Sequence, residues 1–364
     1  MARATTRSHE TRPSPARTTR ILALLLSLYS LRRSPSSVSS LVVPTPLPIL
    51  VTGAAGFIGA RFVESCNRRG IPVVSVDRAS AFDTRPEHRG LDFGVRLDIE
   101  ELPSRLADVR PSSIVHMGAV SSTTELDTEL FRRLNVDYSK TLWEHARRAD
   151  LPFVYASSAA VYGDGSLGFD DRDDLVARLH ALNPYGESKR LFDLWALEES
   201  TAGRHPRVWS GLRFFNVYGF GERHKGPQAS VALHAYDQIR AGGSVRLFRS
   251  HRDGIPDGHQ KRDFISAGDV VDVIWFALTK PLTSGIYNVG TGAARAFLDL
   301  ARAVFAATGA PERIDWIDTP PGIRERYQYF TEAKMDRLRA AGYEKPFTTL
   351  ETGVGAYVRQ LAGR

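Results

Sequence analysis

Residues 49–59 read ILVTGAAGFIG, a short apolar run followed by three glycines spaced as G-x-x-G-x-x-G. The run Ile49–Thr52 is typical of a strand buried on both faces, and the pattern of Phe57–Arg69 indicates a helix that packs against it. The first glycine permits a tight turn, the second lets the backbone approach a pyrophosphate, and the third allows close packing of helix on strand. The stretch therefore predicts a dinucleotide-binding turn at the start of an α/β fold.

The rest of the chain continues this alternation of short apolar runs and longer amphipathic stretches. Further strands are predicted at Val73–Val76, Ser113–His116, Phe153–Ala156, Ser210–Phe214 and Gly285–Gly290. Helices are predicted at Glu129–Arg148, Tyr185–Glu199 and Phe297–Ala307, with another beginning near Gln228. This spacing predicts a Rossmann-type doubly wound parallel sheet.

Two stretches, 217–261 and 293–364, break this rhythm and are rich in aromatic and Arg residues. We expect them to form a smaller C-terminal substrate-binding lobe over the cofactor. The NAD(P)-binding Rossmann domain then comprises 48–216 with 262–292. Residues 1–47 form an N-terminal extension, which is either disordered or a start-site artefact.

The net charge of +7 belongs to that extension. Residues 1–47 hold seven Arg and one Glu, whereas the remainder holds 41 basic and 40 acidic residues. This balance predicts no nucleic-acid partner for the body. The 11-residue apolar run Ile21–Leu31 is too short to span a bilayer as a helix but resembles a signal-peptide core, so a targeting segment stays open as an alternative.

The composition also bears on compartment and metals. Outside the extension no window approaches 18 consecutive apolar residues, so we expect a soluble body and no membrane partner. The scarcity of cysteine fits a reducing compartment such as the cytoplasm. The single cysteine, Cys66, excludes an internal disulfide and a Cys-based zinc cluster. The ten histidines show no ligand spacing, so no metal site is predicted.

Asp77 lies 18 residues past Gly59 at the end of the second predicted strand, where a carboxylate binds the ribose hydroxyls of a dinucleotide. That carboxylate favours NAD, while the adjacent Arg78 favours the 2′-phosphate of NADP, so both cofactors stay open. The segment that begins at His116 is expected to pass beneath the cofactor. The predicted cofactor-binding residues are Gly53, Gly56, Phe57, Ile58, Gly59, Asp77, Arg78, Met117, Gly118, Ala119, Ser121, Asn135, Tyr185, Lys189 and Val217.

Tyr185 and Lys189 stand four residues apart and therefore share one helix face. A tyrosine with an ordinary pKa near 10 is a poor base at neutral pH, so we expect the lysine cation and the nicotinamide to lower it. Ser158 follows a predicted strand, where its hydroxyl is placed to hold a substrate oxygen. Tyr-x-x-x-Lys alone is common, but after the glycine turn and a strand-end serine it predicts redox chemistry.

These motifs carry a resemblance. TGAAGFIG, YASSAAVYG and YGESK (residues 52–59, 155–163 and 185–189) resemble those of extended short-chain dehydrogenases. HMGAVSSTTE, RFFNVYG and ERHKG (116–125, 213–219 and 222–226) resemble the ADP-L-glycero-D-manno-heptose 6-epimerases, over essentially all of residues 49–361. The resemblance implies Ser158, Tyr185 and Lys189 as the catalytic trio. It further implies one tightly bound NADP or NAD per subunit, ADP-heptose as substrate, and a homo-oligomer.

Lys225, carried over from the HKG motif, would be a second acid/base. An epimerase removes a hydride and returns it to the opposite face of the same carbon, so a second proton carrier complements Tyr185. Its alternative role is electrostatic contact with the cofactor or a diphosphate. Pro227 departs from the family pattern, in which a small polar residue often contacts the sugar, and the loop His251–Gln260 is longer than in many members.

Arg249, Arg262 and either Arg324 or Arg326 are placed to neutralise a diphosphate, with solvated surface charge as the alternative. The predicted substrate-binding residues are Ser121, Asn216, His234, Phe248, Arg249, Ser250, Arg262 and Tyr327. For the two aromatics and for His234, simple packing stays open. The rival functions are another nucleotide-sugar epimerase or dehydratase such as a UDP-hexose 4-epimerase, a net nucleotide-sugar reductase, and a non-catalytic NAD(P)H-binding protein.

Overall fold

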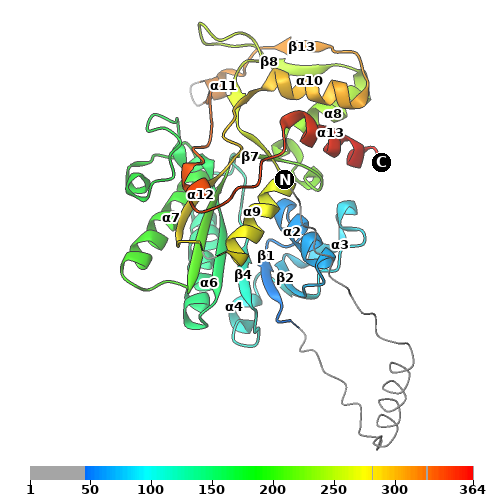
Figure 1. Cartoon of the computed structure of the whole chain (residues 1–364). Coiled ribbons are helices and arrows are strands. Elements are labelled where there is room, and N and C mark those ends of the chain that lie inside the picture. Colours follow the sequence, from blue (N-terminus) through cyan, green and yellow to red (C-terminus); the bar gives the residue numbers. More distant parts are fainter. Residues whose placement is uncertain (1–45, 281, 325–326, 364) are drawn as a thin grey trace, which may run out of the picture. The chain divides into compact units, whose positions relative to one another are not determined.

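The computed structural model describes residues 46–280, 282–324 and 327–363, and Pro46–Arg364 form one compact unit. The predicted extension 1–47 therefore lies outside the described residues, except for Pro46 and Leu47. A sheet of seven parallel strands is ordered β11-β6-β5-β4-β1-β2-β3, and Figure 1 labels its strands β1, β2 and β4. Its strands are β1 (Ile49–Thr52), β2 (Val73–Asp77), β3 (Val95–Asp98), β4 (Ser113–His116), β5 (Pro152–Ser158), β6 (Val208–Phe214) and β11 (Gly285–Val289).

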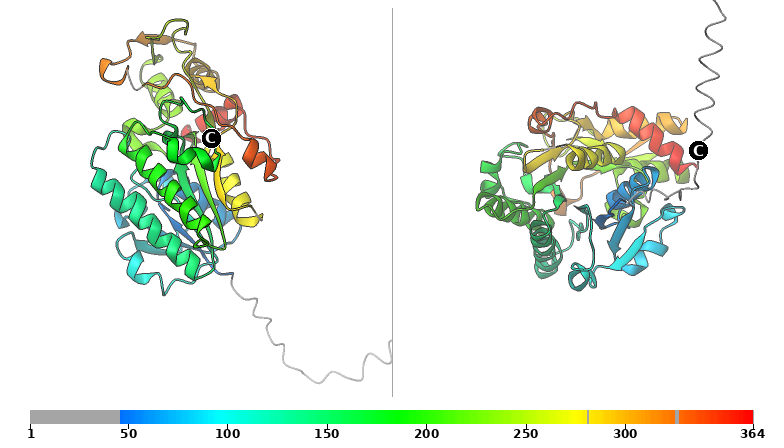
Figure 2. Two further views of the ribbon diagram at one scale, coloured as in Figure 1. Left: turned by 90° about the vertical axis from the view of Figure 1, so that its left-hand side faces the viewer. Right: turned by 60° about the horizontal axis from the view of Figure 1, so that its bottom comes forward.

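Helices flank this sheet in two layers, as Figures 1 and 2 show. They are α2 (Phe57–Arg68), α3 (Ala79–Asp83), α4 (Leu102–Arg105), α5 (Thr128–Phe131), α6 (Tyr138–Arg148), α7 (Pro184–Thr201) and α9 (Ala267–Thr279). Short 3-10 turns connect them: η1 (Pro86–His88), η3 (Ala159–Tyr162) and η4 (Asp173–Arg178). The predicted Rossmann-type doubly wound parallel sheet is confirmed.

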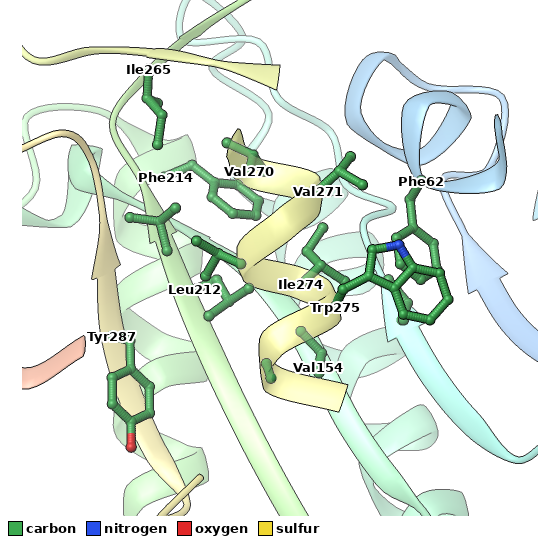
Figure 3. Packing of buried hydrophobic residues seen from close by; sticks show 14 of the residues in the cluster. Phe62, Val154, Leu212, Phe214, Ile265, Val270, Val271, Ile274, Trp275 and Tyr287 are labelled. Carbon is green, nitrogen blue, oxygen red and sulfur yellow. The ribbon is translucent and has the colours of Figure 1, made fainter. Parts of the chain in front are cut away.

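Successive residues of β1 face opposite layers, which is why the strand is apolar throughout. Ile49 and Val51 pack in a cluster with α2 and α9, whereas Leu50 packs on the other face with α6 and α7. In the first layer the rings of Phe62 and Trp275 lie 4.9 Å apart (Figure 3). Burial on both faces is the reason that a parallel sheet shows no polar alternation in its sequence.

A second hydrophobic cluster lies among the elements that belong neither to the seven-stranded sheet nor to the helices that flank it. These are β7 (Asn216–Tyr218), η5 (Arg223–Gln228), α8 (Val231–Gly242), β8 (Val245–Phe248), β9 (Lys261–Arg262), β10 (Phe264–Ser266), β12 (Arg295–Ala296), α10 (Phe297–Thr308), β13 (Ile314–Ile317), α11 (Pro321–Arg324), α12 (Asp336–Ala340) and α13 (Leu350–Leu361). The cluster joins α8, β8, α10 and α13. Ala333, Met335 and Leu338, within the range predicted for the substrate lobe, pack instead with the first cluster. The division into two domains stays a prediction.

The predicted single helix over Glu129–Arg148 is wrong in its middle. Arg132–Asp137 form a π-helical segment, η2, between α5 and α6. This wider turn carries Asn135, whose buried amide bonds to the backbone of Val120 and to Ser188 Oγ. π-Helical turns are rare and often lie at functional sites. Here the turn places Asn135 so that its amide anchors the loop after β4.

The predicted helix near Gln228 begins later, at Val231. Gly226 has a φ of 54°, and Pro227 follows it inside η5. Ser230 then caps α8 by accepting a hydrogen bond from the amide of Leu233. Among the described helices none is long and apolar enough to cross a membrane.

Candidate active site

A cleft of about 730 Å³ opens at the carboxyl ends of the central strands. Its walls come from the glycine turn after β1, from the ends of β2, β4, β5 and β6, from the start of α7, and from η5. Ligands of open α/β sheets bind at this edge, where helix N-termini and loops converge. Of the predicted cofactor-binding residues, the cleft is lined by Gly53, Gly56, Phe57, Ile58, Gly59, Asp77, Arg78, Met117, Gly118, Ala119, Ser121, Tyr185, Lys189 and Val217.

The glycine turn has no room for side chains. Gly53 has a φ of 64°, and a Cβ there would lie 2.6 Å from the amide nitrogen of Gly118. A Cβ on Gly59 would lie 2.0 Å from the carbonyl oxygen of Gly53. Gly56 caps α2 with no side chain over the helix N-terminus, so the first-turn N–H groups face the cleft. This bare, positively polarised turn fits a pyrophosphate.

Asp77 braces the turn as well as lining the cleft. Its Oδ2 accepts a hydrogen bond from the amide of Ala55 over 3.0 Å, and its Oδ1 accepts one from the amide of Arg78 over 2.8 Å. Arg85, which is not among the predicted cofactor-binding residues, donates from Nη1 to the Ala55 carbonyl. Two guanidinium groups, of Arg78 and Arg85, therefore line this end of the cleft together with one carboxylate.

Ser158, Tyr185 and Lys189 meet where β5 ends and α7 begins. Asn183 caps α7 by accepting from the amide of Gly186 over 2.8 Å, which sets Tyr185 in the first turn. The Ser158 hydroxyl lies near that of Tyr185, and both residues line the cleft. One turn further along α7, Lys189 Nζ donates to the Ala156 carbonyl over 2.8 Å. The structure thus brings together the three residues of the predicted trio.

The expected lowering of the Tyr185 pKa is not what the structure shows. Burial raises the pKa of Tyr185, because a phenolate loses its hydration there, and the hydrogen bond from Ser158 only opposes this. Burial also lowers the pKa of Lys189 to about 8, against the pull of the Asp193 carboxylate. Burial therefore disfavours the charged forms of both Tyr185 and Lys189. Ser158 is the neighbour that favours the Tyr185 phenolate.

Lys225 reaches the same cleft from η5. Its ammonium lies 5.5 Å from the ring centre of Phe57, in the first turn of α2. Burial lowers the pKa of Lys225, and the nearby Glu222 opposes the shift. Glu222 is itself fully buried and anchors the loop by accepting hydrogen bonds from Ser230 N and Oγ, both over 2.6 Å. Tyr185 and Lys225 thus offer two titratable groups from different elements.

Some predicted residues do not line the cleft, among them Asn135, Asn216 and His234. Asn135 is buried behind it, and its amide is fully used on Val120 and Ser188. Asn216 is exposed on β7. His234 stands in the first turn of α8, with Nε2 3.3 Å from the Pro227 carbonyl. Ser121, also predicted for the substrate, does line the cleft.

The other predicted substrate residues form a cluster of their own around β8 and β9. The rings of Phe248 and Tyr327 meet edge to face at 6.1 Å, and the Arg262 guanidinium lies 5.6 Å from the Tyr327 ring centre. Arg249 pairs with Asp257 over 3.2 Å, and the Ser250 amide donates to the same carboxylate. None of these residues lines the cleft.

Arg324 and Arg326 were the two alternatives for a third arginine on the diphosphate, and the structure describes only Arg324. Arg324 Nε donates to the Thr319 carbonyl over 2.7 Å. Arg326 lies outside the described residues.

Comparisons with known proteins bear on this site. Residues 49–290 match the model of the NAD dependent epimerase/dehydratase family. The chain belongs to the NAD-dependent epimerase/dehydratase family. Proteins of Fusobacterium nucleatum and Nitratidesulfovibrio vulgaris, each named ADP-L-glycero-D-manno-heptose-6-epimerase, are 41% and 46% identical to it. The alignments cover 87% and 85% of this chain and 98% and 97% of theirs.

The fold of the chain is also similar to that of a solved structure. The Helicobacter pylori ADP-L-glycero-D-manno-heptose-6-epimerase superposes with a TM-score of 0.73 at 27% identity, covering 88% of this chain and 97% of that one. The resemblance identified from the motifs is therefore confirmed, and the glycine turn fits the cofactor for which the epimerase/dehydratase family is named.

Several lining residues were missed in the sequence. The cleft is also lined by Ser122, Tyr138, Phe214, Phe215, His224 and Gln228. Gln228 Nε2 donates to Ser122 Oγ over 2.9 Å, joining η5 to the loop after β4. Ser122, Phe214, Phe215 and His224 lie inside the SSTTE, RFFN and ERHKG motifs, so membership of these motifs was the available signal. Among the described residues, no group of three or more His, Cys, Asp or Glu is placed to hold a metal.

Proposed function

We propose that the protein inverts C6 of ADP-D-glycero-D-manno-heptose, giving ADP-L-glycero-D-manno-heptose through a transient 6-ketone. The observation that carries this proposal is the pair of proton carriers, Tyr185 and Lys225, on one cleft beside a bare glycine turn. The names of the relatives at 41% and 46% identity supply the substrate.

Inverting a carbinol carbon requires removal of a hydride and a proton and their return to the opposite face. Bound NAD(P) supplies the hydride acceptor and then the donor. Gly53, Gly56 and Gly59 would hold its pyrophosphate against the start of α2, and Asp77 with Arg78 would hold the ribose.

The chain's own residues handle the proton. Tyr185 Oη, whose phenolate form Ser158 favours, takes the hydroxyl proton in one orientation of the sugar carbon. In the other orientation Lys225 Nζ is the carrier, and its lowered pKa increases the fraction of neutral amine that accepts a proton at neutral pH.

We propose NADP as the resident cofactor. Both carboxylate oxygens of Asp77 already accept backbone hydrogen bonds, while Arg78 and Arg85 line the same end of the cleft. Two guanidinium groups favour a 2′-phosphate over a free hydroxyl. Mass spectrometry of the small molecule released on denaturation tests this, and release of NAD alone would refute it.

We place the protein in the cytoplasm, as a homo-oligomer that takes a nucleotide sugar as its only partner besides the cofactor. This proposal rests on the need for cytosolic cofactor and activated sugar.

The direct test is proton NMR at C6. The full chain, purified without added nicotinamide, is incubated with ADP-D-glycero-D-manno-heptose. We expect inversion at C6 without added cofactor. No inversion, even with NAD and NADP both supplied, would overturn the heptose assignment.

A further inference from the structure

A fully buried ion pair lies one helical turn beyond Lys189. Asp193 and Arg213 have no exposed side-chain surface, and Arg213 Nε donates to Asp193 Oδ2 over 3.0 Å. Asp193 stands four residues after Lys189 on α7, so both project from one helix face. A buried ion pair seldom stabilises the folded state more than apolar side chains of the same volume would. The role of this pair therefore lies in the groups that it holds in place.

Asp193 ties this helix face to the strand that ends in Ser158. Its Oδ1 accepts from the Tyr155 hydroxyl over 2.9 Å, and its Oδ2 accepts from the Ser157 hydroxyl over 2.8 Å. Between these two residues, the Ala156 carbonyl accepts from Lys189 Nζ. Three successive residues of β5 are therefore fixed to α7, immediately before Ser158, the neighbour of Tyr185.

The sheet makes room for this arrangement. Gly211 of β6 pairs with Tyr155 in the register of the two strands. A Cβ at Gly211 would lie 2.4 Å from the Tyr155 hydroxyl oxygen. The glycine therefore leaves the space that lets the phenol reach Asp193.

Arg213, the other member of the ion pair, contacts residues that do not belong to the fixed part of β5 and α7. Arg213 Nη1 donates to the Tyr162 hydroxyl over 3.0 Å, and that hydroxyl donates to Asn288 Oδ1 on β11 over 2.7 Å. Tyr155 and Tyr162 are thus two buried phenols on the two members of one ion pair. Only Tyr155 belongs to the contacts that fix β5 to α7.

We infer that Asp193 is a positioning residue for the proposed reaction: its carboxylate holds the end of β5 in register with α7, and its charge keeps Lys189 cationic. The inference rests on the proposed function for the reaction that it serves. The charged and titratable groups that surround Lys189 and Asp193 from the packed elements are Tyr185, His116, Tyr155, Arg213, Tyr162 and Asp173.

The electrostatics agree with this geometry. Burial lowers the pKa of Lys189 to about 8, and the Asp193 carboxylate is the neighbour that opposes the shift. Burial, followed by the charge of Lys189, lowers the pKa of His116 to about 3, so this histidine is neutral and adds no second positive charge beside Lys189. The buried residues of η2, which also packs on α7, are the uncharged Asn135 and Val136.

A matched pair of variants tests the positioning role. Tyr155→Phe and Tyr162→Phe each remove one buried hydroxyl from the same ion pair, so both should lower the midpoint of thermal unfolding comparably. In the full-length holoenzyme we expect Tyr155→Phe to lower kcat about tenfold with KM unchanged, because small misplacements of reacting groups are costly. Tyr162→Phe should keep wild-type kcat. Equal kcat values for the two variants would overturn the positioning role.

A second measurement does not depend on turnover. The chain has seven lysines, so the Lys189 signal is resolvable after ¹³Cε labelling and is assigned by its loss in Lys189→Arg. In protein stripped of cofactor we expect Lys189 to titrate near pH 8, and at a lower pH in Asp193→Asn. An unchanged midpoint would overturn the electrostatic role. Should Asp193→Asn fail to fold because Arg213 is left unpaired, the tyrosine pair decides.

The two proposals fail in different ways. A wild-type protein that does not invert the heptose, while Lys189 shifts as expected in Asp193→Asn, counts against the proposed function alone. An active wild-type protein with equal kcat in the two tyrosine variants counts against the inference alone.

Discussion

Tyr185 and Lys225 approach one cleft from different parts of the chain, Tyr185 on the first turn of α7 and Lys225 on η5. Their environments differ, since burial raises the pKa of the phenol and lowers that of the amine. Burial therefore favours the neutral form of both groups. Two acid/base groups on different elements suit a reaction that must move a proton on either face of one carbon.

Replacing either group should therefore slow turnover. We expect Tyr185→Phe and Lys225→Met each to lower kcat by about 10²-fold or more, the usual contribution of a positioned acid or base. Lys280→Met, at an exposed lysine after α9, is the control and should keep full activity. Steady-state kinetics measure kcat for the three variants. Full activity in both Tyr185→Phe and Lys225→Met would contradict the proton-carrier roles.

The lowered pKa of Lys189 predicts how activity depends on pH. Lys189 is cationic below about pH 8 and loses its proton as the pH rises through that value. Activity that needs the cation should be full below this value and fall above it. A kcat profile from pH 6 to pH 10 measures the midpoint, and a profile flat to pH 10 would show that the charge on Lys189 is not required.

At the scale of the element, the glycine turn is set by contacts within 3 Å. Gly59→Ala would bring a Cβ to 2.0 Å from the Gly53 carbonyl, so α2 must shift away from β1. We expect a loss of about 1–3 kcal/mol in the free energy of unfolding, typical of overpacking, together with weaker cofactor retention.

Gly242→Ala is the matched control for this change. Gly242 ends α8 in the open, and a Cβ there would meet no atom within 4 Å, so alanine should stabilise by about 0.5–1 kcal/mol. Chemical denaturation measures both variants. Equal stabilities would contradict the close packing of α2 on β1.

Elements whose sequence pattern follows from local packing were predictable. The strand Ile49–Thr52 and the start of α2 stand where the apolar run and the glycines indicate, because both are decided within a few residues. The π segment η2 was not, since it exists to let Asn135 reach Val120 and Ser188, which are distant in sequence. The delayed start of α8 likewise depends on Glu222 and Ser230 meeting in space.

At the scale of the described chain, the strand order places the glycine turn, Ser158 and Tyr185 on one edge of the sheet, as the motifs predicted. The sequence did not reveal that Asn135 is buried or that Phe248, Arg262 and Tyr327 gather apart from the cleft. Their placement depends on how β8, β9 and the segment after α11 fold together, and no local pattern encodes that.

The central claim is that C6 is inverted by removing a hydride and returning it to the same carbon. The most direct measurement follows ADP-D-glycero-D-manno-heptose carrying deuterium at C6, incubated with the protein in ordinary water. Mass spectrometry and NMR of the product should show inversion with the deuterium retained at C6. Inverted product in which solvent hydrogen has replaced the deuterium would contradict the account.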